Sequence, residues 1–235
     1  MVRQVRTTDR EPGRLSARPA ANRGTGPPTE TGLLPLGLDG RRDGLLYVPP
    51  TYRPGAPLSV KLHGAGGHGR AGLEPFLAGA DAAGLLLLGV DSRGPTWDLI
   101  RGGFGGDVAF LDAALDQVFS RFEVDATRVS IEGFSDGASY ALSLGLANGE
   151  LFSKVVAFSP GFLAPGRLQG RPEVFVSHGV HDRVLPIDRC SRRIVPELEV
   201  AGYSVDYREF DGGHTVPDDI AAAAEAWVAT ATPTA

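Results

Sequence analysis

Cysteine is almost absent from this chain, since Cys190 is the single one among 235 residues. One thiol cannot close a disulfide within the chain, so the fold is expected not to depend on an oxidising compartment. Cys190 falls in a predicted helix after Pro186, where we expect a small packing residue rather than a reactive thiol. No apolar run approaches the roughly 20 residues that span a membrane, and the leucines at 85–88 are typical of a buried strand. Stable membrane insertion is therefore not expected.

Basic residues are fewer than acidic ones, with 23 lysines and arginines against 28 aspartates and glutamates. The formal net charge is −5, which argues against nucleic acid as the main partner. The arginine-rich start, residues 1–23, contains no apolar stretch of the kind found in secretory signals, so we predict a cytoplasmic protein. We interpret 1–23 as a flexible leader that joins the sheet near residues 13–19. Residues 24–235 have the length and composition of one α/β domain.

Strands and helices alternate in the predicted pattern from residue 44 onward. Alternation of this kind is typical of a mostly parallel central sheet with helices on both faces. The clearest amphipathic helix covers 107–122. The Pro- and Gly-rich segment 49–55 predicts a hairpin, with antiparallel strands at one edge of the sheet. The predicted strands cover residues 45–48, 58–62, 84–90, 128–132, 154–158, 174–177 and 203–210.

The most informative motif is Gly-Phe-Ser-Asp-Gly at residues 133–137, between a predicted strand and a predicted helix. A G-x-S-x-G sequence in that context is typical of a nucleophile elbow. Small residues at both ends allow neighbouring backbone to pass close by. Ser135 is then placed at a helix N-terminus, where free N–H groups favour developing negative charge. The Asp136 carboxylate must turn away from that charge, and we expect it to face the N–H groups of the first helical turn.

A serine hydroxyl needs a base and an orienting carboxylate before it can act as a nucleophile. Asp182 follows the predicted strand 173–179, at the end where open α/β sheets place functional residues. His214 follows Gly212 and Gly213 on a loop after the last predicted strand. The chain order of serine, acid and histidine is that of α/β-hydrolases.

A glycine loop upstream, His-Gly-Ala-Gly-Gly at residues 63–67, ends another predicted strand. Such a loop can supply one backbone donor of an oxyanion hole, and the residue after the nucleophile supplies the other. The donors here are the N–H of Asp136 and the N–H of Ala65 or, alternatively, Gly66. We interpret His63 as a structural imidazole bonded to the loop backbone.

These segments together resemble the α/β-hydrolase superfamily from about residue 44 to the last helix. They are most similar to its predicted-esterase group of phospholipase/carboxylesterase and polyhydroxyalkanoate-depolymerase-like proteins. The resemblance implies a serine esterase with nucleophile Ser135, acid Asp182 and base His214, acting on a small-molecule ester without a cofactor. Thioesterase and lysophospholipase activities on the same triad are alternatives. No cap domain fits between 158 and 174, which predicts an open, shallow site for small or exposed acyl groups.

Two further sets of residues have a functional and a structural interpretation. Trp97 and Phe104 could wall the substrate pocket, or they could simply pack. His178 and His181 beside Asp182 lack the fixed spacing of a helical pair of ligands, so we predict no metal.

The main rival interpretation starts from Gly64, Gly66 and Gly69, which form a G-x-G-x-x-G match after a strand. Asp91 lies at the distance expected for a ribose-binding acid, which suggests a dinucleotide-binding oxidoreductase. That hypothesis leaves Ser135, Asp182 and His214 unexplained. An inactive hydrolase-fold binding protein is a third hypothesis. The sequence leaves the oligomeric state open, a homodimer included.

Overall fold

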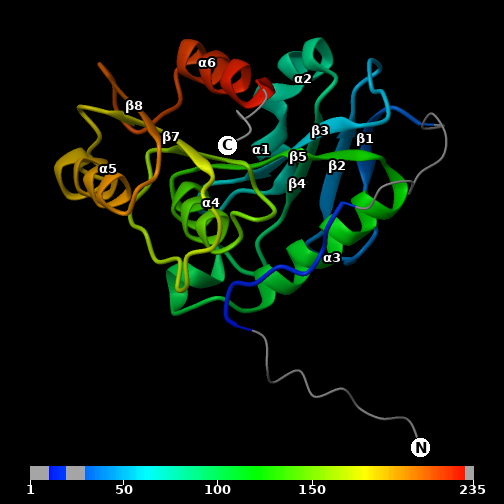
Figure 1. Cartoon of the computed structure of the whole chain (residues 1–235), viewed down its shortest axis with the longest axis horizontal. Coiled ribbons are helices and arrows are strands. Elements are labelled where there is room, and N and C mark those ends of the chain that lie inside the picture. Colours follow the sequence, from blue (N-terminus) through cyan, green and yellow to red (C-terminus); the bar gives the residue numbers. More distant parts are fainter. Residues whose placement is uncertain (1–10, 20–29, 231–235) are drawn as a thin grey trace, which may run out of the picture.

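One eight-stranded sheet organises the computed structural model, which describes residues 11–19 and 30–230 (Figure 1). The strand order is β1-β2-β4-β3-β5-β6-β7-β8. Strands β3 to β8 run parallel, whereas β1 and β2 are antiparallel to their neighbours at one edge. The strands are β1 Gly32–Pro35, β2 Gly44–Val48, β3 Ala56–Leu62, β4 Leu86–Val90, β5 Val124–Phe134, β6 Lys154–Phe158, β7 Glu173–Gly179 and β8 Val205–Phe210.

Helices cover both faces of this sheet, which makes three layers (Figure 1). The α-helices are α1 Gly69–Leu73, α2 Leu77–Ala83, α3 Gly106–Arg121, α4 Asp136–Ala147, α5 Ser191–Val200 and α6 Asp218–Ala229. Short 3-10 turns cover Glu74–Phe76, Asp98–Arg101 and Ile187–Arg189.

Alternate residues of the central strands enter different cores, because successive side chains of a strand point to opposite faces. Val155 packs with the core beneath α3, α4 and α5, whereas its neighbour Val156 packs with α6. Both faces of β3, β4 and β6 are buried, which explains their nearly continuous apolar sequences. The α/β fold class predicted from the sequence is therefore confirmed.

The predicted strands all fall on strands of the structure, but the hairpin at residues 49–55 is wrong. Strand β2 pairs with β4 and not with β3. The connection at 49–55 therefore passes β4, which lies between β2 and β3 in the sheet. The antiparallel edge exists, and it is formed by β2 with the unpredicted strand β1. The apolar strand β4 is buried along its whole length, so it is accommodated between β2 and β3 rather than at the edge. Within the described residues, no helix is long and apolar enough to cross a membrane.

The segment 11–19, part of the predicted leader, does not join the sheet. It lies instead against α3 and the C-terminal end of α4. Leu15 is buried and its N–H donates to Asn148 Oδ1 at 2.9 Å, while Asp112 on α3 accepts the N–H of Ser16 at 2.6 Å. Asp112 on α3 and Asn148 just after α4 thus accept the backbone N–H groups that a neighbouring strand would otherwise have bonded. The other leader residues, 1–10 and 20–23, lie outside the described part of the chain.

Asn148 is the residue that holds this N-terminal segment in place. Its buried amide accepts from Leu15 N–H and donates to Gly13 O at 2.7 Å and Leu144 O at 2.9 Å. We expect Asn148→Ala to lower the free energy of unfolding by about 2–3 kcal/mol, since it leaves buried backbone groups unpaired. Urea titration would measure this loss. Ser16→Ala, which removes an exposed hydroxyl bond to Asp112, is the control and should cost about 0.5 kcal/mol or less. Equal losses in the two variants would contradict the assignment.

Candidate active site

Ser135 occupies a sharp turn between β5 and α4, with φ 58° and ψ −119°. A positive φ is unusual for a residue with a side chain, and it persists only where the surroundings enforce it. The turn is enforced by tight packing at two glycines. A Cβ on Gly133 would lie 2.2 Å from Gly137 O, and a Cβ on Gly137 would lie 2.3 Å from Leu62 O. Larger residues are therefore excluded at both positions, as the elbow interpretation requires.

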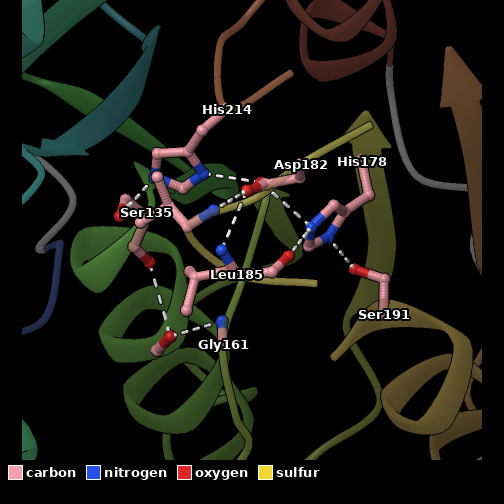
Figure 2. Close-up of polar contacts among 9 residues, drawn as sticks. Ser135, Gly161, His178, Asp182, Leu185, Ser191 and His214 are labelled. Carbon is pink, nitrogen blue, oxygen red and sulfur yellow. Dashed lines mark hydrogen bonds and ion pairs between the residues drawn. The ribbon is translucent and has the colours of Figure 1, made fainter. Parts of the chain in front are cut away.

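The structure brings the three predicted triad residues together at the carboxyl edge of the sheet (Figure 2). His214 Nε2 lies 2.8 Å from Ser135 Oγ, and His214 Nδ1 lies 2.6 Å from Asp182 Oδ2. The ionised carboxylate only accepts hydrogen bonds, so Nδ1 carries the proton that faces Asp182. This tautomer leaves Nε2 as an acceptor directed at the serine hydroxyl.

The Asp182 carboxylate is fully supplied with donors. Oδ1 accepts the N–H groups of Val184 and Leu185, each at 2.8 Å, while Oδ2 faces His214 and, at 3.2 Å, His178 Nε2 (Figure 2). Burial acts to raise the pKa of Asp182, but the hydrogen bonds from Leu185, His214 and Val184 outweigh it and lower that pKa. Asp182 is therefore anionic and fixed in orientation at neutral pH.

His178 lies behind Asp182 and is completely buried. Its Nε2 is 2.8 Å from Leu185 O, and its Nδ1 is 2.7 Å from Ser191 Oγ. Burial lowers the pKa of His178, which favours the neutral ring. Because the Leu185 carbonyl only accepts, Nε2 carries the proton and Nδ1 accepts from Ser191. The sequence suggested only one function to test for His178, that of a metal ligand. Its position directly before Gly179 at the end of β7 was the signal that could have indicated a supporting role.

His181 points away from the triad, with Nε2 3.0 Å from Asp211 Oδ1 at the exposed surface. Both ring nitrogens of His178 are engaged by protein atoms, so the two histidines do not converge on a common point. Among the residues that the structure describes, no group of three or more histidine, cysteine or acidic side chains is arranged to hold a metal ion.

The glycine loop at 63–67 lies beside the elbow. A Cβ on Gly64 would lie 3.5 Å from Ser135 Cβ, so the loop backbone closely approaches the predicted nucleophile. Gly66 N–H donates to Pro95 O at 2.7 Å. Because the Gly66 N–H is already hydrogen-bonded, Ala65 is favoured over Gly66 as the second oxyanion donor.

The side chain of Asp136 turns away from the elbow, but not toward the helix N–H groups that we expected. Its Oδ2 accepts the Thr96 hydroxyl at 2.6 Å. The carboxylate is thereby held on the side of the loop that follows β4, while the backbone N–H of Asp136 remains at the start of α4.

Trp97 and Phe104, for which the sequence left a pocket wall and plain packing open, both pack against Tyr140 in the structure. Trp97 is 1% exposed, and its Nε1–H donates to His63 O at 2.8 Å. Phe104 packs edge-on against Tyr140, which also contacts Trp97. Trp97 thereby holds the start of the glycine loop, and Phe104 is connected to it through Tyr140.

His63 has the structural role that the sequence predicted. Its Nδ1 lies 2.7 Å from Gly64 O, and its Nε2 accepts Ser92 N–H at 3.1 Å. Burial lowers the pKa of His63, although the bond to Gly64 acts in the opposite direction. The neutral ring thus connects the glycine loop to the end of β4.

Asp91, the acid on which the dinucleotide-binding interpretation depended, bonds the start of α1, just after the glycine loop. Its Oδ1 accepts Gly69 N–H at 2.7 Å, at the start of α1. The carboxylate thus occupies the helix N-terminus that would receive a pyrophosphate in such a protein.

Known proteins were compared with this chain by sequence and by structure. No family model matches the chain. Feruloyl esterase C of Emericella nidulans is 27% identical over 157 residues, which cover 63% of this chain and 57% of that protein. The chain spans about half the length of the curated relatives it matches.

Two solved structures cover most of the chain. Esterase PE8 has a TM-score of 0.67 and 23% identity, covering 80% of this chain and 97% of that one. S-formylglutathione hydrolase FrmB of Staphylococcus aureus has a TM-score of 0.69 and 14% identity, covering 86% of this chain and all of that one. This protein has the α/β-hydrolase fold, as its motifs indicated. The relatives and neighbours that resemble it include esterases and other hydrolases.

The lowered pKa of His63 predicts a dependence of stability on pH. Below about pH 6.5 the unfolded chain binds a proton at this position that the folded protein does not, so folding becomes less favourable as the pH falls. We expect urea midpoints to decrease from pH 7.5 to pH 5. His63→Gln, which stays neutral, should reduce the accompanying decrease in the free energy of unfolding by up to about 1.4 kcal/mol per pH unit. An unchanged pH dependence in His63→Gln would contradict the assignment.

Proposed function

We propose that this protein is a serine hydrolase that cleaves carboxylic esters of small or exposed acyl groups through an acyl-enzyme. The continuous hydrogen-bonded series Ser135–His214–Asp182 carries this proposal. The esterases among the relatives support it. The substrate is a small-molecule ester, and the reaction requires no cofactor.

In the first half of the reaction, Ser135 Oγ attacks the carbonyl carbon of the ester. His214 Nε2 takes the hydroxyl proton as the new C–O bond forms, and the anionic Asp182 stabilises the resulting imidazolium. The tetrahedral intermediate then collapses, the bond to the alcohol oxygen breaks, and His214 returns the proton to that oxygen. The products are the free alcohol and an ester on Ser135.

The negative charge on the carbonyl oxygen is stabilised by backbone N–H groups of Ala65 and Asp136. Each donor of this kind contributes on the order of 3 kcal/mol to the transition state. The hydrogen bond from Thr96 keeps the Asp136 carboxylate away from that oxygen. Without it, a second negative charge beside the oxyanion would oppose the reaction.

In the second half, water replaces the alcohol. His214 removes a proton from a water molecule as its oxygen attacks the acyl carbon, and then protonates Ser135 Oγ as the acid leaves. The loop 159–172 between β6 and β7, which the structure describes completely, contains no helix and no named strand. Access of water and ester therefore requires no lid movement at this connection.

Ser135→Ala tests the nucleophile. We expect kcat for p-nitrophenyl acetate to fall by about 10⁴-fold or more, with the melting temperature retained, and labelling by a fluorophosphonate to be lost. Ser120→Ala is the matched control, because this exposed hydroxyl on α3 bonds only within its own helix turn. Retained turnover or labelling in Ser135→Ala would refute the proposal.

His178 is proposed as a positioning residue for Asp182. His178→Gln removes the imidazole N–H beside the carboxylate, and we expect kcat to fall about tenfold with little change in KM, as for loss of one hydrogen bond to a charged group. Ser191→Ala, which releases the other ring nitrogen, should act in the same direction but more weakly. Steady-state kinetics and melting temperatures separate the two readouts. Lower melting temperatures with unchanged kcat in both variants would show a purely structural role.

A further inference from the structure

A large cavity lies beside the triad, between helices α2 and α6. Its volume is about 850 Å³, and its floor is formed by β3 and β5. Figure 1 shows α2 and α6 on the same side of the sheet, next to each other. This cavity, here named the α2–α6 groove, is not used by the mechanism above.

The walls of the α2–α6 groove are small and apolar. Helix α6 contributes four alanines along its length, and α1 and α2 contribute alanine and glycine opposite them. Ala222 and Ala226 on α6 are exposed. A Cβ on Gly79 of α2 would lie 3.5 Å from the Glu225 side chain, which is ordinary van der Waals contact, so α2 and α6 leave room for one methyl group at that point. Apolar surface of this extent gains free energy when an apolar ligand covers it.

The charged groups at the floor are satisfied by one another. Lys61 is 2% exposed, and its Nζ lies 2.7 Å from Glu132 Oε2 and also bonds Glu225. The ring of Phe76 lies against the same ammonium, 3.7 Å from its centroid. Lys61 therefore has no need of an anionic ligand, and the groove does not have the character of a phosphate or carboxylate site.

One end of the groove meets the active site. Its rim includes Gly64 and Ala65 of the glycine loop, and Phe134, the residue before Ser135. The Phe134 ring packs on His214, with centroids 4.7 Å apart. The groove therefore begins next to the turn that carries Ser135.

The chemistry of the proposed reaction decides which half of the ester faces the groove. The leaving alcohol oxygen must face His214 Nε2, because it receives its proton from that atom. The carbonyl oxygen faces the N–H groups of Ala65 and Asp136, so the acyl group is the remaining substituent. The groove starts beside it, where a Cβ on Gly64 would lie 3.5 Å from Ser135 Cβ.

We propose that the α2–α6 groove binds the acyl chain of the substrate, and that the chain is a slender, unbranched apolar one. This proposal rests on the proposed function and specifies its substrate class. From Asp218 to Ala229, α6 advances about 16 Å. An extended chain advances about 1.2 Å per bond, so the groove accommodates on the order of ten carbons. The groove is open along its side, so the bound chain remains partly exposed without a lid.

Chain-length profiles of p-nitrophenyl esters, from acetyl to hexadecanoyl, test the proposal. In the unmodified protein, kcat/KM should rise by about two- to fourfold per added methylene and level off near ten carbons. Ala226→Trp blocks the far half of the groove, so the optimum should shift to shorter chains. Ala222→Trp, one turn nearer the triad, should shift it further. Hydrolysis of the acetyl ester should stay within about twofold in both variants.

Ala78→Trp is the matched control, since Ala78 is exposed on α2 and does not line the groove. It should leave the whole profile unchanged. A flat profile in the unmodified protein, or identical optima in Ala222→Trp and Ala226→Trp, would overturn the acyl groove while leaving the esterase proposal intact. Absence of turnover and of fluorophosphonate labelling with every ester would instead refute the proposed function. A dimer that Ala226→Trp dissociates, with an unchanged profile, would show that a second copy of the chain occupies the groove.

Discussion

The arrangement of the site depends on one buried carboxylate. Asp182 accepts two backbone N–H groups through one oxygen, and the other oxygen faces the rings of His214 and His178. The backbone bonds fix the carboxylate to the turn after β7, and the ring bond selects the tautomer of His214. The acceptor that faces Ser135 is therefore determined by the turn after β7, through Asp182 and the tautomer of His214. Ser191 at the start of α5 extends the same network into the body of the domain.

A second constraint comes from backbone packing around the elbow. Gly133 and Gly137 contact each other and β3 so closely that a methyl group fits at neither position. This contact sets the height of Ser135 above the sheet and brings Gly64 against it. The glycine loop, in turn, is held by His63 and Trp97, and Asp91 holds the start of α1 that follows it. Proposed nucleophile and proposed oxyanion donors are thus positioned by the same close approach of two loops.

Sequence reasoning performed best where a residue type has one physical explanation. The elbow glycines, the order of Ser135, Asp182 and His214, and the alternation of strands and helices all predict features that depend on local sterics or periodicity. It performed worse where pairing partners are chosen over long distances. The segment 49–55 has the composition of a hairpin, yet β2 pairs with β4, because burial of a continuous apolar strand outweighs local turn preference. The contact of Asp136 with Thr96 and the support of Asp182 by His178 join residues whose proximity only the fold creates. The α2–α6 groove was equally inaccessible, since alanine and glycine carry no pattern that distinguishes an open wall from a packed one.

The attachment of residues 11–19 to Asn148 has a consequence for how the chain is made. The first of these bonds joins Leu15 to a residue 133 positions later. During synthesis Asp112 on α3 emerges before Asn148, so docking of the N-terminal segment is complete only after α4 has emerged. Until then the far end of the helix that carries Ser135 at its start has a buried amide without its final partners. Completion of α4 and docking of residues 11–19 are therefore coupled in time, and closing so large a loop slows that step.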